Sequence, residues 1–298
     1  MSSISRIPMP TLRILDSLSD PGNAARRNED IAGGNAACAF VIDGATGLGG
    51  KLLLDATSDA AWLAVFAAQA FEAEIHMTNP IADVVRNVNM RVRQRIVEVA
   101  AGDTLETWAL PTASFQLVRM EGRELAVYGL GDCRLFLAGA DGTAFETNGD
   151  YSKAESEGAR RAVAQAGGLA AWRSLAEEPV VREALRRSRA RHNQPGGAVW
   201  TLGSAPDAAA HLSIRRFGPA LPARGLLCTD GFSALADKYG RYDGAGLIRT
   251  AGEHGLHELM KELRRIERDE DPDGQQYPRF KVSDDATAVL FEIVAWPA

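Results

Sequence analysis

The sequence has few cysteines, no long apolar run and no excess of basic residues. Its three cysteines, Cys38, Cys133 and Cys228, are too few for a disulfide scaffold. Each lies in an apolar run, so we expect three small buried side chains. No apolar run approaches the roughly 18 residues that a membrane-spanning helix needs. The first residues also lack the apolar stretch of a signal peptide, and we therefore expect a cytoplasmic protein.

The charge balance excludes further classes of partner. Asp and Glu number 39 against 33 Lys and Arg, which gives a formal net charge of −6. Binding to a nucleic acid or to an anionic membrane needs clustered basic surface, so we expect neither as a partner. The Arg-rich segment 182–191 is the main local exception, and we interpret it as a solvated helix face.

Composition and pattern together indicate one α+β domain. Hydrophobic residues make up 46% and charged residues 24% of the 298 residues, as in a protein with a packed core. No internal repeat or low-complexity linker divides the chain, so we expect a single domain over residues 1–298. Strand-like runs follow one another directly in 112–137, which favours antiparallel pairing over strand–helix–strand crossovers. The predicted strands cover 37–42, 112–120, 124–129, 133–137, 211–217, 224–228 and 286–294. The predicted helices cover 58–75, a segment after Pro80, parts of 150–191, and then 244–251 and 255–268.

Acidic residues recur where the predicted apolar strands meet turns. A carboxylate at the end of a buried strand is partly desolvated, so several in one place repel one another unless a cation compensates. Hard divalent cations supply this compensation, because they prefer oxygen ligands. An Asp-Gly pair is also a common turn, so one such pair is a weak indication of a site. The acidic residues at predicted strand ends are Glu29, Asp30, Asp43, Asp132, Asp230, Asp284 and Asp285.

These acidic residues belong to five short blocks whose order is typical of one enzyme family. The blocks are Arg-Arg-Asn-Glu-Asp (26–30), Val-Ile-Asp-Gly (41–44), Gly-Leu-Gly-Asp-Cys-Arg-Leu-Phe-Leu (129–137), Leu-Leu-Cys-Thr-Asp-Gly-Phe (226–232) and Ser-Asp-Asp-Ala-Thr-Ala-Val-Leu (283–290). Through them the chain, from about residue 15 to 294, resembles the metal-dependent protein phosphatases of type 2C. The resemblance implies a four-layer α-β-β-α sandwich, in which two mainly antiparallel sheets lie between helices. It also places the helical segment at about 151–194 where the family has a flap beside its active site.

The resemblance implies a centre of two divalent cations, Mn²⁺ or Mg²⁺. Asp43 would bridge the two ions, which together lower the pKa of a shared water so that hydroxide is available near neutral pH. Asp30 would orient this water, so Asp30 and Asp43 are the residues expected to act in catalysis. The metal ligands implied in this way are Glu29, Asp43, Gly44 through its carbonyl, Asp230 and Asp284.

A third ion is expected to bind weakly or not at all. In many members of the family, the residue that matches Asp132 holds a third ion together with a second aspartate, four residues after the one that matches Asp230. In this chain the second aspartate is replaced by Ala234, so Asp132 lacks that partner.

Two further positions depart from the family pattern. The family arginine that binds the substrate phosphate is replaced by Ala25, and we expect Arg26 or Arg27 to bind the phosphate instead. The histidine that often follows the Asp-Gly motif is replaced by Ala45. Neither change removes a ligand of the central pair of ions.

Other patterns point to different chemistry, and each fits less well. The Gly-rich segment 44–51 suggests a nucleotide-binding loop, but its first required glycine is absent and Leu52 cannot ligate magnesium. His254 and His257 are spaced like metal ligands on a helix, yet no carboxylate pattern accompanies them, and we interpret them as surface or packing residues. The acidic turn 269–274 lacks the alternation of a calcium-binding EF-hand loop, so we interpret it as a solvated loop.

The predicted function is metal-dependent hydrolysis of a phosphomonoester, with phosphoserine or phosphothreonine of a protein as the main expected substrate. The three substitutions leave an alternative open, namely a weakly active or inactive protein of the same fold that binds a phosphoprotein or another partner. Activity on small metabolites is open as well, because the same chemistry permits it. We expect a monomer or a weak dimer.

Overall fold

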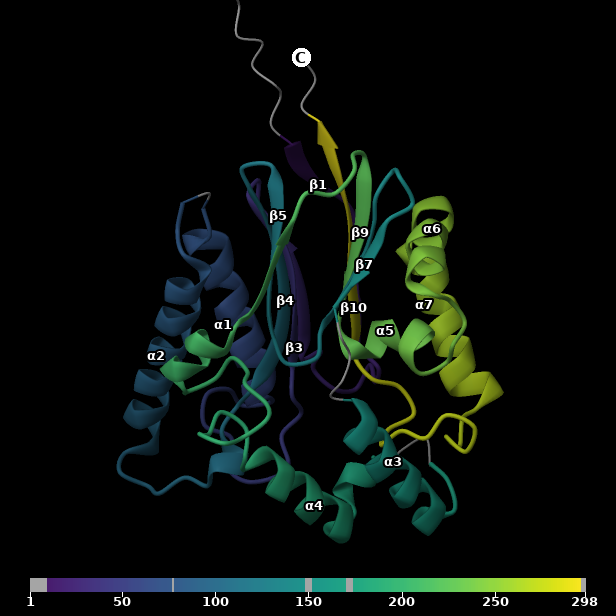
Figure 1. The fold of residues 1–298 in the computed structure, drawn as a ribbon. Helices are drawn as coiled ribbons and strands as arrows, with labels where there is room; N and C mark the ends of the chain where they lie inside the picture. Colours follow the sequence, from purple (N-terminus) through teal and green to yellow (C-terminus); the bar gives the residue numbers. More distant parts are fainter. Residues whose placement is uncertain (1–9, 77, 148–151, 170–173, 296–298) are drawn as a thin grey trace, which may run out of the picture.

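Two five-stranded sheets face each other at the centre of the molecule (Figure 1). The structure is a computed structural model that describes residues 10–76, 78–147, 152–169 and 174–295. The strand order is β1-β10-β9-β6-β7 in one sheet and β2-β3-β4-β5-β8 in the other. Every neighbouring pair of strands in both sheets is antiparallel. The strands are β1 (Pro10–Asp20), β2 (Asp30–Gly34), β3 (Cys38–Gly44), β4 (Ala113–Glu121), β5 (Glu124–Leu130), β6 (Arg134–Ala138), β7 (Ala144–Glu146), β8 (Ser213–Phe217), β9 (Ala223–Cys228) and β10 (Ala286–Ala295).

Helices cover the outer face of each sheet. Figure 1 shows α1 and α2 on the side of β3, β4 and β5, and α5, α6 and α7 on the side of β9 and β10. The helices α3 and α4 lie instead across one end of the sandwich. The helices are α1 (Asp59–Glu74), α2 (Ile81–Ala100), α3 (Ser152–Ala166), α4 (Pro179–Arg189), α5 (Asp230–Asp237), α6 (Gly244–His254) and α7 (Leu256–Arg265), with a π-helical turn η4 (Ile266–Glu270) after α7.

Three apolar clusters hold the layers together. One lies between α1, α2 and the adjacent sheet and contains Phe40, Phe71 and Phe115. A second fills the space between the two sheets, and a third packs α5, α6 and α7 against the other sheet. The predicted four-layer α-β-β-α sandwich of antiparallel sheets is therefore confirmed. The three cysteines are free and buried, as the apolar runs around them predict.

The helices that cover β3 begin and end where the sequence indicates. The Ser58 side chain accepts a hydrogen bond from the backbone N–H of Ala61 and so caps α1. Helix α2 buries Ile81, Val84, Val85 and Val88 at helical spacing and turns its polar side to solvent. None of the described helices is long and apolar enough to cross a membrane.

Some elements differ from the sequence-based expectation. Strands β1, β2 and β7 were not predicted, because they lie at sheet edges and lack a continuous apolar run. The acidic turn 269–274 is not a solvated loop throughout, since Asp271 is 3% exposed and accepts a hydrogen bond from Arg279 at 2.6 Å. His254 ends α6 and His257 belongs to α7, so the two exposed histidines do not share a helix.

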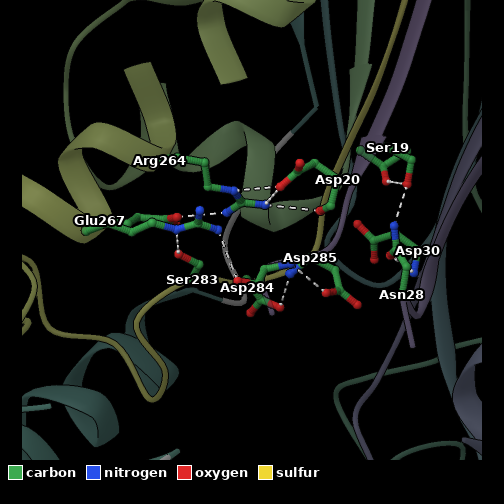
Figure 2. A network of polar contacts seen from close by, with 12 residues as sticks. Ser19, Asp20, Asn28, Asp30, Arg264, Glu267, Ser283, Asp284 and Asp285 are labelled. Atoms are coloured by element: carbon green, nitrogen blue, oxygen red, sulfur yellow. Dashed lines mark hydrogen bonds and ion pairs between the residues drawn. The ribbon is translucent and has the colours of Figure 1, made fainter. Parts of the chain in front are cut away.

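A buried ionic network joins α7 to the strand ends of its sheet. Figure 2 shows the Arg264 side chain between Asp20 at the end of β1 and Glu267 in η4. The Arg264 guanidinium donates to Glu267 Oε2 at 2.7 Å and to Asp20 Oδ1 at 2.8 Å. Glu267 is 2% exposed, and burial raises its pKa although the charge of Arg264 opposes this. The network lies beside Ser283 and Asp284, so it supports the segment that leads into β10.

Replacing Glu267 by alanine should destabilise the protein by about 3 kcal/mol, because the Arg264 charge then keeps Asp20 but loses its more deeply buried carboxylate partner. Urea denaturation gives the free energy of unfolding directly. Glu258→Ala is the matched control, since Glu258 forms an exposed ion pair with Lys261 at 2.7 Å and should contribute less than about 1 kcal/mol. Equal losses in the two variants would contradict this role of the network.

Candidate metal centre

Strand pairing brings the acidic residues to the same end of the sandwich. Asp30 begins β2 and Asp43 lies near the end of β3, and the two are direct cross-strand partners. In the facing sheet, β9 ends beside the start of β10, so Asp230 and Asp284 approach each other. Asp132 lies in the turn between β5 and β6. Because antiparallel neighbours place the end of one strand beside the start of the next, residues far apart in sequence share this edge.

Two glycines permit the close approach of backbones around these carboxylates. A Cβ atom on Gly44 would lie 2.6 Å from the carbonyl oxygen of Glu29, and one on Gly231 would lie 2.0 Å from that of Asp285. The N–H of Gly44 donates to the Glu29 carbonyl at 3.0 Å. A side chain at either position would therefore push apart the segments that carry the acidic residues.

Hydrogen bonds connect the two halves of this edge. The Thr229 hydroxyl, at the end of β9, donates to Asp30 Oδ2 at 2.7 Å across the gap between the sheets. The Asp285 carboxylate accepts from the backbone N–H of Glu29 at 2.7 Å and from that of Gly22 at 3.0 Å. Asp30 and Asp285 are thus fixed by donors from the opposite sheet or from the loop that leads to it.

Burial and mutual repulsion dominate the electrostatics. Burial raises the pKa of Asp30 well above its ordinary value, and the charges of Asp284, Asp285 and Asp230 raise it further. Burial likewise raises the pKa of Asp43, with added repulsion from Asp30, Asp230, Asp132 and Asp284. The surrounding carboxylates therefore lie close enough to disfavour the charged forms of Asp30 and Asp43, which is the situation that a divalent cation relieves.

One lysine partly offsets this negative charge. The Lys281 ammonium forms an ion pair with Asp284 Oδ1 at 2.5 Å. Burial opposes its charge, yet the carboxylates of Asp284, Asp285 and Glu29 raise the pKa of Lys281 above its ordinary value. Glu29 is itself held by the Thr46 hydroxyl, which donates to Glu29 Oε2 at 2.5 Å, and by the Ser58 hydroxyl.

The oxygen atoms at this edge are of the kind that divalent cations prefer, but several of them already contact hydroxyl or ammonium groups of the protein. Carboxylates and a backbone carbonyl are the oxygen ligands that Mn²⁺ and Mg²⁺ prefer. Among the described residues, however, no three His, Cys, Asp or Glu side chains are arranged so that they could hold an ion as they stand. Glu29, Asp30 and Asp284 point to hydroxyl or ammonium donors instead. Ion binding by the expected ligands Glu29 and Asp284 would therefore compete with these donors.

The arginines expected to bind phosphate lie near the edge in ion pairs. Arg26 pairs with Glu177 at 2.6 Å and Arg27 with Asp55 at 2.8 Å, and both arginines are largely exposed. Of the replaced positions, Ala25 is exposed, Ala45 is half-buried, and Ala234 lies in α5 with its side chain buried in the core.

Two arginines of the segment 182–191 are not the solvated residues that the sequence suggested. Arg186 donates twice to the carbonyl oxygen of Leu48, at 2.8 and 3.0 Å, and its guanidinium lies 3.9 Å from the centre of the Trp108 ring. Arg189 donates to the carbonyl oxygen of Thr46 at 2.7 Å. Helix α4 is thus anchored to the loop that follows Asp43 and Gly44.

Sequence reasoning missed the polar residues that hold the acidic ones. Thr229, Thr46, Ser58 and Lys281 contact Asp30, Glu29 or Asp284, yet no pattern singled them out as members of the site. Thr229 adjoins Asp230, and Thr46 follows the Asp-Gly pair closely, so proximity to a motif was the available signal. Lys281 lies three residues before Asp284 and gave no comparable signal.

Asp43→Asn should stabilise the protein in the presence of a chelator at neutral pH. A raised carboxyl pKa means that the folded state binds a proton more readily than the unfolded state, so the charged form of Asp43 destabilises the fold above that pKa. The stabilisation of the variant relative to the wild type should therefore shrink as the pH falls from neutral towards 4 and Asp43 becomes protonated. Thermal unfolding across this pH range measures both effects. A lower Tm for the variant at neutral pH would contradict the predicted repulsion.

Several solved protein structures resemble this two-sheet sandwich in fold. No protein-family model matches the sequence, and no curated protein matches it. Among solved structures, the catalytic domain of the Ser/Thr protein phosphatase PstP in complex with two manganese ions is 17% identical, with 96% of this chain and 99% of that chain covered and a TM-score of 0.51. The Mycobacterium tuberculosis Ser/Thr phosphatase PstP/Ppp is 17% identical, with 96% and 100% covered and a TM-score of 0.52. PppA of Pseudomonas aeruginosa is 17% identical as well, with 97% and 99% covered and a TM-score of 0.51. The chain therefore has the fold of the metal-dependent Ser/Thr phosphatases of type 2C.

Proposed function

We propose that this protein is a divergent member of the type 2C phosphatases and hydrolyses phosphomonoesters with the help of two divalent cations. The observation that carries the proposal is the convergence of acidic residues from both sheets at one edge of a sandwich with this fold. Burial and mutual repulsion raise the pKa of Asp30 and of Asp43 there. An arrangement that disfavours its own charges is typical of a functional site rather than of a structural one.

The residues that would hold the cations come from both sheets. Asp43 would bridge two ions, Mn²⁺ or Mg²⁺, with Glu29 and the Gly44 carbonyl on one side and Asp230 and Asp284 on the other. When bound, such ions lower the pKa of a water and neutralise charge on a phosphoryl group. The fold comparison supports a centre with two ions, because one similar structure is a phosphatase in complex with two manganese ions.

The remaining residues have roles that follow from their contacts. Asp30 would accept a hydrogen bond from the attacking water, and the Thr229 hydroxyl fixes its carboxylate for this task. Arg26 and Arg27 would bind the substrate phosphate after release from Glu177 and Asp55. Asp132 would hold a third ion only weakly, because the position that would share it is Ala234.

The substrate proposed is a phosphorylated serine or threonine in a protein. The helical segment at about 151–194 contains α3 and α4, which lie across the end of the sandwich (Figure 1). Since Arg186 and Arg189 of α4 contact the loop after Gly44, this segment can act as a flap that contacts the peptide around the phosphate. The whole chain would then form one catalytic domain, and we propose that it acts in the cytoplasm.

Asp43→Asn and Asp230→Asn should each lower manganese-dependent hydrolysis of p-nitrophenyl phosphate by at least about 100-fold. Residues that only support metal ligands typically contribute 10- to 100-fold, and direct ligands should contribute at least as much. Asp83→Asn is the matched control, since Asp83 is an exposed residue at the start of α2 in an ion pair with Arg86, and it should keep full activity.

The same samples separate the phosphatase from a binding protein of the same fold. Manganese binding without turnover in the wild type would favour the binding protein, and it would point to the substitutions at positions 25 and 45 as the cause. Turnover that survives both Asp43→Asn and Asp230→Asn would contradict the proposed centre.

Arg186→Ala should raise the KM for a phosphopeptide severalfold and leave p-nitrophenyl phosphate turnover within about twofold. p-Nitrophenyl phosphate has no peptide chain for α4 to contact, whereas a phosphopeptide has one. Arg187→Ala on the same helix is the control, because Arg187 is exposed. Steady-state kinetics with both substrates provides the measurement, and equal effects on both substrates would exclude a flap role for α4.

A further inference from the structure

Lys281 connects the two halves of the candidate metal centre. Its ammonium lies 2.5 Å from Asp284 Oδ1, just before β10 of one sheet. It also lies 3.5 Å from the Thr46 hydroxyl, which follows β3 of the other sheet. Thr46 in turn donates to Glu29. A single side chain thus contacts Asp284 directly and Glu29 through one hydroxyl.

The position of Lys281 is fixed from several directions. Its side chain is only 32% exposed, and that of Asp284 is 40% exposed, so the ion pair is partly shielded from water. The ammonium lies between Asp284 and the Thr46 hydroxyl, so it offsets part of the repulsion among the carboxylates.

A divalent cation and the ammonium compete for the same carboxylate. Asp284 Oδ1 is the oxygen that Lys281 contacts, and the proposed function requires Asp284 as an ion ligand. Two positive groups a few ångströms apart repel each other strongly in a partly buried site. Loading of the ion at Asp230 and Asp284 must therefore break the Lys281–Asp284 pair or proceed against the charge of the lysine.

We propose that Lys281 is an internal competitor for the divalent cation on the Asp230 and Asp284 side of the centre. In the metal-free protein its ammonium stabilises the acidic edge, and on metal binding it turns away from Asp284. The protein consequently binds this ion more weakly than the carboxylates alone would bind it. The site therefore fills only at a higher metal concentration. The inference rests on the proposed metal centre.

Calorimetric titration with Mn²⁺ tests the competition directly, because it does not depend on activity. Lys281→Met keeps the length and apolar stem of the side chain and removes the charge. It should tighten binding of one of the two ions by about tenfold, and it should leave the other ion less affected. Lys281→Arg retains the charge and should bind manganese much as the wild type does. Lys261→Met is the control, since Lys261 forms an exposed ion pair on α7.

A second readout comes from thermal unfolding. With chelator present, Lys281→Met should have a lower Tm than the wild type, because the carboxylates lose a compensating charge. With saturating Mn²⁺ its Tm should rise by more than that of the wild type, since tighter binding to the folded state stabilises it further.

The possible results are distinguishable. Manganese affinity that is unchanged in Lys281→Met would overturn the competition and leave the metal centre intact. Weaker binding would overturn it too, and would assign Lys281 to positioning Asp284. If neither the wild type nor the variant binds manganese at millimolar concentration, the metal centre and the competition are both wrong. Manganese binding by Lys281→Met but not by the wild type would support the competition most strongly.

Discussion

Repulsion among carboxylates at one edge of two facing sheets is the constraint on which the rest of this structure depends. Antiparallel pairing places Asp30 beside Asp43 in one sheet, and it brings Asp230 towards Asp284 in the other. Neighbouring carboxylates raise the cost of charge on Asp30 and on Asp43. The fold tolerates this because hydroxyls, backbone N–H groups and one ammonium are directed at the same edge.

The surroundings of this edge are built to keep it in place. Near the start of β10, the network of Arg264, Asp20 and Glu267 supports the segment that carries Asp284. Beyond the end of β3, Arg186 and Arg189 attach α4 to the loop that follows Gly44. The ionic network on one side and α4 on the other thus hold the segments that lead to the carboxylates. In the proposed centre, an exchange between ions and protein donors would then involve the carboxylate side chains.

Sequence patterns allowed prediction of most strands and helices and of the acidic residues, and the family resemblance added the four layers. Both failed for the partners of the acidic residues. The apolar run before Asp43 and the helical spacing after Pro80 report burial, which depends on neighbours along the chain. The end-of-strand positions of Asp43, Asp230 and Asp284 followed from the same patterns. Asp30 was singled out by the order of the motifs, since β2 was not predicted. Lys281 could not be recognised, because its contacts with Asp284 and Thr46 depend on how two sheets meet. Arg186 was misjudged for a similar reason, since a helix with many arginines gives no sign of which ones find a backbone carbonyl.

Manganese-soaked crystals measured at the manganese absorption edge would test the central claim most directly. The account predicts two anomalous peaks at this edge of the sandwich. One should be bounded by Glu29, Asp43 and the Gly44 carbonyl, and the other by Asp43, Asp230 and Asp284, with the Lys281 ammonium turned away from Asp284. Peaks elsewhere on the protein, or no ordered manganese among these carboxylates, would contradict it.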